Sequence, residues 1–248
     1  MKMKDFDSNG ITFFHGDCLL RLKELSTESV DAVLTDPTYS SGGLSLAVKQ
    51  QAPAKKYQLS GTKKSYPPML GDNKDQRSFT VWAILWLSEC WRIARDGAPL
   101  MVFTDWRQLP SVTDAIQGAG WLWLGIVPWN KRSCRPSIGR FRQQCEYVVF
   151  GSKGKLKAET SKCLPGLYDH PVIPQHKVHI TGKPVDLFAE LLEASRPGGT
   201  VLDPFIGGGT TALAALKTGR KCIGVELSKD YFDLSVGRIQ DFFNNIVK

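Results

Sequence analysis

Two short segments, far apart in the sequence, carry residue types that could do chemistry together. The first, TDPTY at residues 35–39, follows an apolar run and contains a carboxylate, a proline, a hydroxyl and an aromatic ring: Asp36, Pro37, Thr38 and Tyr39. The Asp36 carboxylate and the Pro37 carbonyl can accept the two hydrogens of an exocyclic base amine, which localises the nitrogen lone pair for attack on an electrophile. Tyr39 offers a flat ring for stacking that base. The segment predicts a site that activates a nucleobase amine.

The second segment, TVLDPFIGGGTTALAAL at residues 200–216, has the pattern of a strand, a glycine turn and a helix. The glycines at 207–209 allow the backbone to approach a ligand closely, and the start of the helix supplies unpaired amide donors. Glu226 lies about 20 residues downstream at the end of another apolar run, where a doubly wound fold places a carboxylate for ribose hydroxyls. The segment therefore predicts a cofactor site.

The kind of cofactor follows from the motifs around these glycines. The chain contains neither GxGxxG nor GxxxxGK[ST], which disfavours NAD and ATP. Asp203, beside the turn, would repel a pyrophosphate but could help to anchor a cationic or amine-bearing ligand. S-adenosylmethionine fits, because it has an amino group, a sulfonium charge and no phosphate. The alternative is that the glycines form only a tight turn, with Asp203 as its cap.

Short apolar, β-branched runs alternate with amphipathic stretches along the chain. The expected strands cover residues 30–35, 98–103, 124–129, 146–151, 200–205 and 221–227, and the expected helices cover 17–25, 78–94, 114–120, 183–195, 210–219 and 228–246. This alternation predicts an α/β fold with a doubly wound, mostly parallel sheet. Trp82, Trp86 and Trp91 fall at helical spacing and are expected in the core. Because ligands bind beyond the carboxyl ends of such strands, folding should bring Asp36 and Asp203 into one crevice.

The 248 residues are expected to form a single domain, residues 1–248, with two inserted segments. Residues 44–75 lack periodicity, contain basic pairs and prolines, and are expected to form a mobile basic loop. Residues 131–179 begin with the dense basic run KRSCRPSIGRFR and are Lys-rich and interrupted by prolines further on. Both insertions are candidates for contacting a polyanion.

The net charge of +8 favours nucleic acid as that polyanion, because clustered Lys and Arg gain affinity by displacing counterions from phosphates. The best candidate phosphate-binding residues lie in the basic run, interleaved with Trp129 and Phe141: Lys131, Arg132, Arg135, Arg140 and Arg142. The alternative is a solvated loop whose charges serve only solubility.

The expected location and metal content of the protein follow from sequence patterns that the chain lacks. The N-terminus has no apolar core of the signal-peptide type, and no stretch approaches the roughly 20 apolar residues of a membrane span, so we expect a cytoplasmic protein. The six cysteines form no CxxC pair, which indicates reduced thiols rather than disulfides or a zinc site. We therefore expect no metal.

Together, these segments resemble the DNA amino-methyltransferases that modify adenine N6 or cytosine N4, in the permuted group whose catalytic tetrapeptide precedes the cofactor loop. The resemblance is carried by HGDCLLRLKELSTESVDAVLTDPTY at residues 15–39 and by residues 179–239, from HITGKPVDLF to SVGRI. It implies the Rossmann-like fold of S-adenosylmethionine-dependent methyltransferases, double-stranded DNA as the substrate and a bacterial or phage origin, and it suggests a homodimer. The base would have to be flipped out of the duplex for direct in-line transfer.

The resemblance also implies roles for single residues. It implies that Asp17 contacts the adenine of the cofactor and that Glu226 contacts its ribose. Lys183 corresponds to the lysine of a Lys-Pro pair in the family. The full set of implied cofactor-binding residues is Asp17, Cys18, Asp36, Lys183, Asp203, Pro204, Phe205, Gly207, Gly209, Thr210, Thr211, Glu226 and Leu227. The catalytic set is the tetrapeptide at residues 36–39.

The tetrapeptide departs from the family pattern at one position. Thr38 replaces the second proline of DPPY or SPPY, which relaxes the loop and should affect turnover rate more than reaction type. Asp36 stands where cytosine-N4 enzymes tend to have Ser, which favours adenine N6. The alternatives left open are a cytosine-N4 enzyme, a methyltransferase for RNA or a protein amide, and a DNA-binding protein that has lost catalysis through Thr38. C5 methylation of cytosine is disfavoured, because the chain has no Pro-Cys dipeptide.

Overall fold

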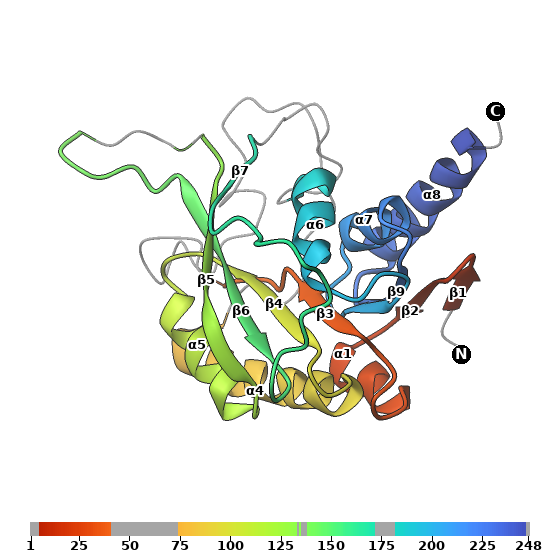
Figure 1. Cartoon of the computed structure of the whole chain (residues 1–248), viewed down its shortest axis with the longest axis horizontal. Coiled ribbons are helices and arrows are strands. Elements are labelled where there is room, and N and C mark those ends of the chain that lie inside the picture. The colour runs from red at the N-terminus through yellow and green to blue at the C-terminus, as the bar shows by residue number, and fades with distance from the viewer. Residues whose placement is uncertain (1–4, 41–73, 133, 135–137, 172–181, 247–248) are drawn as a thin grey trace.

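The structure, a computed structural model, describes residues 5–40, 74–132, 134, 138–171 and 182–246, and is built around one central sheet (Figure 1). Within that part of the chain the strands are β1 (Asp5–Ser8), β2 (Ile11–His15), β3 (Ala32–Thr35), β4 (Pro99–Thr104), β5 (Leu122–Asn130), β6 (Cys145–Ser152), β7 (Tyr168–Asp169), β8 (Thr200–Asp203) and β9 (Lys221–Glu226). The helices are α1 (Cys18–Arg21), α4 (Gln76–Ile93), α5 (Leu109–Gly118), α6 (Val185–Leu191), α7 (Thr210–Lys217) and α8 (Lys229–Ile246), with 3₁₀ turns at Leu22–Glu24 and Leu192–Ala194.

The strands lie in the order β1-β2-β9-β8-β3-β4-β6-β5-β7. From β2 to β4 every neighbouring pair is parallel, whereas β1 and β6 run against their neighbours. Parallel neighbours need crossover connections, and helices in those crossovers cover both faces of the sheet. The predicted doubly wound, mostly parallel α/β sheet is confirmed.

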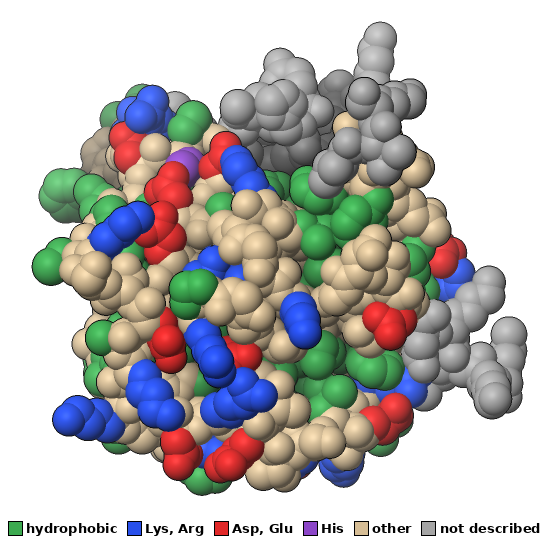
Figure 2. Space-filling view, turned by 45° about the vertical axis from the view of Figure 1, so that its right-hand side comes forward, with side chains coloured by type: hydrophobic (Ala, Val, Ile, Leu, Met, Phe, Trp, Pro, Cys, Tyr) green, Lys and Arg blue, Asp and Glu red, His purple; other side chains and the backbone are tan. Residues whose placement is uncertain are grey.

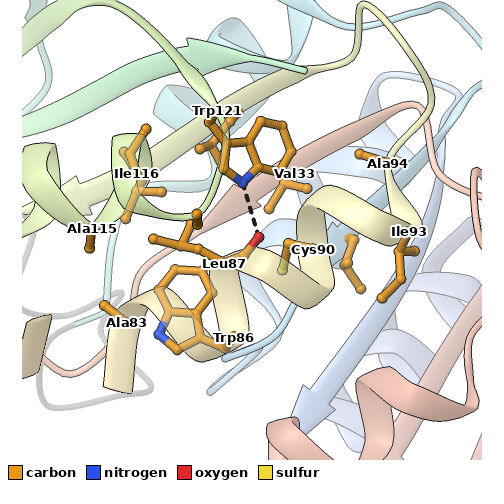
Figure 3. Packing of buried hydrophobic residues seen from close by; sticks show 14 of the residues in the cluster. Val33, Ala83, Trp86, Leu87, Cys90, Ile93, Ala94, Ala115, Ile116 and Trp121 are labelled. Atoms are coloured by element: carbon orange, nitrogen blue, oxygen red, sulfur yellow. Dashed lines mark hydrogen bonds between the residues drawn. The ribbon is translucent and has the colours of Figure 1, made fainter. Parts of the chain in front are cut away.

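Each face of the sheet has its own apolar core. Helices α1, α4 and α5 cover one face, and α6, α7 and α8 cover the other (Figure 1). Figure 3 shows the first core, where Trp86 and Leu87 of α4 pack beside Ile116 of α5 and the Trp121 indole donates to the Leu87 carbonyl at 3.0 Å. Burying a leucine of this kind stabilises the fold by roughly 1.5–3 kcal/mol. The two cores hold the central sheet rigid from both faces.

Several elements differ from the sequence-based expectation. The hairpin β1–β2 was missed, although it turns at Asn9 and Gly10, whose φ angles of 49° and 82° are those that an Asn-Gly hairpin turn requires. β7 has two residues, which is too short for any period to show. Helix α5 begins at Leu109, earlier than expected, because Pro110 suits the first turn of a helix.

The predicted core tryptophans divide among three environments. Trp86 is buried, with 1% of its surface exposed. Trp91 is 37% exposed, and the Lys153 ammonium lies 4.4 Å from its ring centroid, so its assignment to the core is wrong. Trp82 is half-buried and lines the cavity described below.

The two predicted insertions are described only in part. Residues 44–73 of the first insertion and residues 133, 135–137 and 172–179 of the second lie outside the described residues. Asp75, the last residue of the first insertion, caps α4 by accepting the Ser78 amide at 2.8 Å. The single-domain organisation stays a prediction. Among the helices that the structure describes, none has the length and apolar character needed to cross a bilayer.

Candidate active site

The carboxyl ends of β3 and β8 lie side by side, and each leads into one of the two predicted chemical segments. The strands pair in parallel, with Val33 opposite Leu202. The Thr35 hydroxyl donates to the Asp203 carboxylate at 2.6 Å, which joins the segments across 168 positions of sequence. A cavity of about 390 Å³ is lined by both. Open parallel sheets bind their ligands at this edge.

Asp36 is held by two donors inside the protein. The Tyr39 hydroxyl donates to Asp36 Oδ1 at 2.6 Å, and the Lys183 ammonium donates to Asp36 Oδ2 at 2.6 Å. The Lys183 side chain is only 5% exposed. Burial raises the pKa of Asp36, and Lys183 offsets part of that rise. Pro37 is buried and Thr38 half-buried, and both line the cavity.

A second carboxylate, Glu146 at the start of β6, faces the same groups. Its Oε2 lies 3.1 Å from the Lys183 ammonium and accepts the Tyr39 hydroxyl at 3.1 Å, while its Oε1 accepts the Lys131 ammonium at 2.9 Å. Burial alone would raise the pKa of Glu146, but Lys183 and Lys131 lower it to about 2. We refer to Asp36, Tyr39, Lys131, Glu146 and Lys183 as the tetrapeptide end of the cavity.

The charges of the tetrapeptide end balance, since two carboxylates face two ammonium groups. Burial would lower the pKa of Lys183, but Asp36 and Glu146 raise it above its ordinary value. Burial and the same two carboxylates raise the pKa of Tyr39 well above its usual range. Lys183 therefore stays an ammonium group and Tyr39 stays a hydroxyl donor at any working pH.

The glycine turn is shaped by backbone conformations that favour glycine. Gly207 and Gly209 have φ angles of 51° and 79°, and Gly209 caps α7. A Cβ on Gly209 would also lie 3.2 Å from Cβ of Ser235. The Gly207 and Ser228 amides donate to the two oxygens of Glu226 at 2.9 and 2.8 Å. Burial raises the pKa of Glu226 to about 7 despite these bonds.

Asp203 connects the turn to the strand before it. Besides the Thr35 hydroxyl, its carboxylate accepts the Thr211 hydroxyl and, at 3.0 Å, the Phe205 amide. Burial raises the pKa of Asp203 to about 6. These contacts are those of a turn cap, the alternative weighed from the sequence, and a contact between Asp203 and a ligand stays a prediction. We refer to residues 203–211 and Glu226 as the glycine end of the cavity.

The remaining predicted cofactor-binding residues surround the glycine end. Asp17 caps α1 by accepting the Leu19 amide at 2.8 Å. Burial raises the pKa of the Cys18 thiol to about 12, so this thiol is not a reactive nucleophile. The cavity lining includes Asp17, Cys18, Lys183, Pro204, Phe205, Thr210 and Leu227. The structure thus brings all these residues to one cavity, and their roles toward a cofactor stay predictions.

The sequence reasoning missed several residues of the cavity lining, and two of them, Glu146 and Trp82, show why. Glu146 is the single acid between Asp114 and Glu159 and opens an apolar strand, a signal that could have singled it out. Trp82 was assigned to the core by its helical spacing, yet its ring lies 5.2 Å from that of Phe205 at the cavity wall. Spacing alone cannot tell a helix face that meets the core from one that meets a ligand site.

The predicted phosphate-binding residues do not form one surface. Arg140 and Arg142 are exposed on the connection between β5 and β6. Arg132 is bound by both oxygens of Asp169, at 2.8 and 2.9 Å. Lys131 lines the cavity instead. Arg135 lies outside the described residues.

The aromatic residues of the basic run also differ from each other. Phe141 is 95% exposed, as a surface residue should be. Trp129 is 1% exposed, and its indole donates to the His170 carbonyl at 2.8 Å, so its assignment to a DNA-contacting face is wrong. On the face of the molecule shown in Figure 2, basic and acidic side chains lie among each other, so the net positive charge is not gathered there.

Comparison with known proteins shows what the chain is similar to. A family model described as "DNA methylase", for N6 and N4 methyltransferases, matches residues 156–237. The type II methyltransferase M.HinfI of Haemophilus influenzae is 28% identical over 258 residues, covering 94% of this chain and 69% of that protein. The putative methylase YubD of Escherichia coli (strain K12) is 28% identical over 221 residues, covering 88% of this chain and 86% of its own. These matches bear out the resemblance to the DNA amino-methyltransferases that the sequence indicates.

The fold of the chain is shared with solved structures of low sequence identity. The M1.HpyAVI–SAM complex superposes with a TM-score of 0.66 at 22% identity, covering 92% of this chain and 98% of that one. The cytosine-N4-specific PvuII DNA methyltransferase superposes with a TM-score of 0.70 at 18% identity, covering 96% and 93%. Within the described residues of the chain, no group of three His, Cys, Asp or Glu side chains is placed to hold a metal ion.

Proposed function

We propose that this methyltransferase transfers a methyl group from S-adenosylmethionine to the exocyclic N6 of adenine in double-stranded DNA, in line, on a base flipped out of the duplex. The observation that carries the proposal is that the Asp36 carboxylate shares one cavity with the glycine turn and Glu226. The family match and the relatives named as methyltransferase and methylase support DNA as the substrate.

The glycine end fits S-adenosylmethionine by the chemistry of its groups. Among the described residues, Asp203 and Glu226 are bonded by hydroxyl and amide donors, with no Lys or Arg paired to either. A cationic ligand would complete their charge balance, whereas a pyrophosphate would be repelled. Glu226 also ends its strand where a doubly wound fold binds ribose hydroxyls. When bound, the cofactor supplies a methyl group on a sulfonium, which an amine can attack.

The tetrapeptide end would prepare the amine for that attack. One amine hydrogen can bond to Asp36 Oδ1 and the other to the Pro37 carbonyl, which makes the nitrogen more tetrahedral and its lone pair more available. With the cofactor held by the glycine end, attack by this nitrogen would form the nitrogen–carbon bond and would leave the carbon–sulfur electron pair on sulfur. The surplus amine proton can pass to Asp36, whose pKa is raised by burial, and then to solvent. The Tyr39 ring offers the face on which the base stacks.

We favour adenine over cytosine because an aspartate, and not a serine, opens the tetrapeptide. An adenine amine stacked and paired within a duplex cannot reach a carboxylate at the sheet edge, so the base has to be flipped. The exposed Arg140 and Arg142, on the connection that joins β5 to β6, offer contacts to phosphates.

The test is to incubate the protein with methyl-labelled S-adenosylmethionine and duplex DNA of mixed sequence, to digest the DNA to nucleosides and to identify the labelled base. Asp36→Ala should lower the rate by about 10²–10³-fold, because it removes a group that acts on developing charge. Asp233→Ala, which removes a half-exposed carboxylate paired with Lys229, is the matched control and should leave the rate unchanged.

Each other outcome assigns a different function. Label on cytosine N4 would show that the protein is a cytosine-N4 enzyme. Label on RNA or protein but not on DNA would show that its substrate is not DNA. Binding of S-adenosylmethionine without transfer to any acceptor would indicate a DNA-binding protein impaired by Thr38. Full activity of Asp36→Ala would remove the role given to that carboxylate.

A further inference from the structure

Both oxygens of Asp36 are occupied within the protein. Lys183 holds Oδ2 and the Tyr39 hydroxyl holds Oδ1, each at 2.6 Å. An amine that approaches Oδ1 must displace the Tyr39 hydroxyl. A buried hydroxyl that loses its acceptor without finding another costs about 1–3 kcal/mol. The displaced hydroxyl therefore needs a second acceptor close by.

Glu146 supplies such an acceptor without any movement of the tyrosine ring. Its Oε2 lies 3.1 Å from the Tyr39 hydroxyl oxygen, so rotation of the hydroxyl hydrogen is enough to change partners. The same Oε2 lies 3.1 Å from the Lys183 ammonium, and Oε1 is held by Lys131 at 2.9 Å. Glu146 is thus fixed by two lysines within hydrogen-bond distance of Tyr39.

We propose that Glu146 is a positioning residue for the methyl transfer: it receives the Tyr39 hydroxyl when the target amine takes Asp36 Oδ1, and it holds Lys183 against Asp36 throughout. This inference rests on the proposed function of the cavity. It adds to that function a cavity residue that acts through Tyr39 and Lys183 and decides whether Asp36 is accessible to the amine.

Charge makes Glu146 suited to this exchange. Its 15% exposed side chain faces Lys131 and Lys183, so it stays an anion and a strong hydrogen-bond acceptor. Removing it would leave Lys131 without this carboxylate and Lys183 with Asp36 alone, and among the described residues it would leave Asp36 as the acceptor of the Tyr39 hydroxyl. The hydroxyl would then compete with the substrate for the same oxygen.

The alternative is that Glu146 merely anchors β6 to the loop before α6 through its ion pairs. A structural anchor and a second acceptor for Tyr39 differ in one respect. The anchor acts whatever side chain stands at position 39, whereas the acceptor matters only while the tyrosine hydroxyl is present. A double-mutant cycle between Glu146 and Tyr39 separates the two.

The experiment measures kcat at saturating DNA and cofactor for the wild-type protein, Glu146→Ala, Tyr39→Phe and the double variant. Glu146→Ala alone should lower kcat by about ten- to a hundredfold, since the tyrosine hydroxyl then blocks Asp36. In the Tyr39→Phe background the same change should lower kcat by less than about threefold, since no hydroxyl needs an acceptor. KM for DNA and the Kd of S-adenosylmethionine, measured by calorimetry, should stay near the wild-type values in all four.

Glu146→Gln keeps an acceptor but removes the charge, and it guards against a variant that fails to fold. It should retain kcat within about threefold of the wild type. Its acid limb in the pH profile of kcat should move to lower pH, because the charge of Glu146 raises the pKa of Asp36. The other groups that act on Asp36 are Lys183, Tyr39 and, across the cavity, Asp203.

Two results would overturn the inference and indicate that Glu146 is only a structural anchor. One is that the kcat losses of the two single variants multiply in the double variant. The other is that Glu146→Gln is as impaired as Glu146→Ala and its acid limb does not move. The wild-type assay comes first and separates the two levels of the proposal. A wild-type protein that labels no acceptor would refute the proposed function, whereas an active wild-type protein with an uncoupled cycle would refute only the role of Glu146.

Discussion

The two ends of the cavity bury the same chemical group and stabilise it differently. At the tetrapeptide end, Asp36 and Glu146 share the ammonium of Lys183. At the glycine end, Asp203 and Glu226 are held by hydroxyl and amide donors that carry no charge. The pKa values follow the partners, since the lysines lower that of Glu146 to about 2 and burial raises that of Glu226 to about 7.

This difference shows what each end lacks. A buried charge is stable only when it is paired, and the tetrapeptide end is paired from within the protein. At the glycine end the carboxylates are bonded by uncharged donors, so the negative charge that they carry once ionised is left for a cationic ligand to balance. Removing a lysine should therefore damage the tetrapeptide end most, whereas pH and ligand should act mainly on the glycine end.

The largest effect is expected for Lys183→Met. Two carboxylates would then share a buried place with only Lys131, and losing one partner of a buried pair costs about 3–5 kcal/mol. The pKa of Asp36 should rise further, since Lys183 is the group that lowers it. At neutral pH more of Asp36 would be protonated, so kcat should fall by about a hundredfold and recover as the pH is raised.

The measurements are the free energy of unfolding in urea and the pH profile of kcat. Lys217→Met is the matched control, because Lys217 forms an ion pair with Asp186 while more than half of each side chain is exposed. It should change stability by less than about 1 kcal/mol. An effect of Lys183→Met no larger than that of the control would contradict the charge balance described for the tetrapeptide end.

At the glycine end, pH should move stability and ligand affinity in opposite directions. The folded pKa of Glu226, about 7, lies above the ordinary value of 4.5, so the folded protein binds this proton more tightly than the unfolded chain. Its contribution to stability is present below the unfolded pKa and is lost as the pH rises through about 7. Affinity for S-adenosylmethionine should instead fall below that pH, because ribose hydroxyls bond best to the ionised carboxylate.

Calorimetry on the wild-type protein should show the Kd of S-adenosylmethionine rising by up to about tenfold for each pH unit below 7. Glu226→Gln should bind about tenfold more weakly at high pH and lose most of this pH dependence. Glu193→Gln, at a half-exposed carboxylate paired with Lys162, should behave as the wild type. A wild-type Kd that is independent of pH would show that Glu226 is not the group that binds the ribose.

Local patterns predicted the elements of the site better than its contacts. The turn at Gly207 and Gly209 was readable, because consecutive glycines between a strand and a helix indicate left-handed backbone there. The meeting of Asp36 with Asp203 followed from the parallel sheet. Glu146 could not be found in this way, because its partners Tyr39 and Lys183 come from different parts of the chain and only the folded sheet brings them together.

Strand alternation would have corrected the reading of the basic run. The backbone pairing of β5 with β6 continues one residue beyond the strand, since the Lys131 amide donates to the Gln144 carbonyl at 2.9 Å. Residues two apart on a strand share a face, so Lys131 follows the buried Trp129 inward, whereas Arg132 points out. Counting the run as a single charged patch ignored this period.

The smallest effect concerns the exposed part of that run and separates it from the tetrapeptide end. If Arg140 and Arg142 each contact one phosphate, the double Ala variant should lower the slope of log K for DNA against log salt by about 1.8, since each contact contributes about 0.9. At saturating DNA its kcat should stay unchanged, because neither arginine belongs to the cavity lining.

Lys131→Met should do the opposite, lowering kcat through Glu146 while leaving the salt dependence as it is. Fluorescence titrations of labelled duplex at several salt concentrations provide the slopes. A lowered slope for Lys131→Met would show that Lys131 contacts a phosphate of the DNA. Glu146 would then have one ammonium partner in the complex.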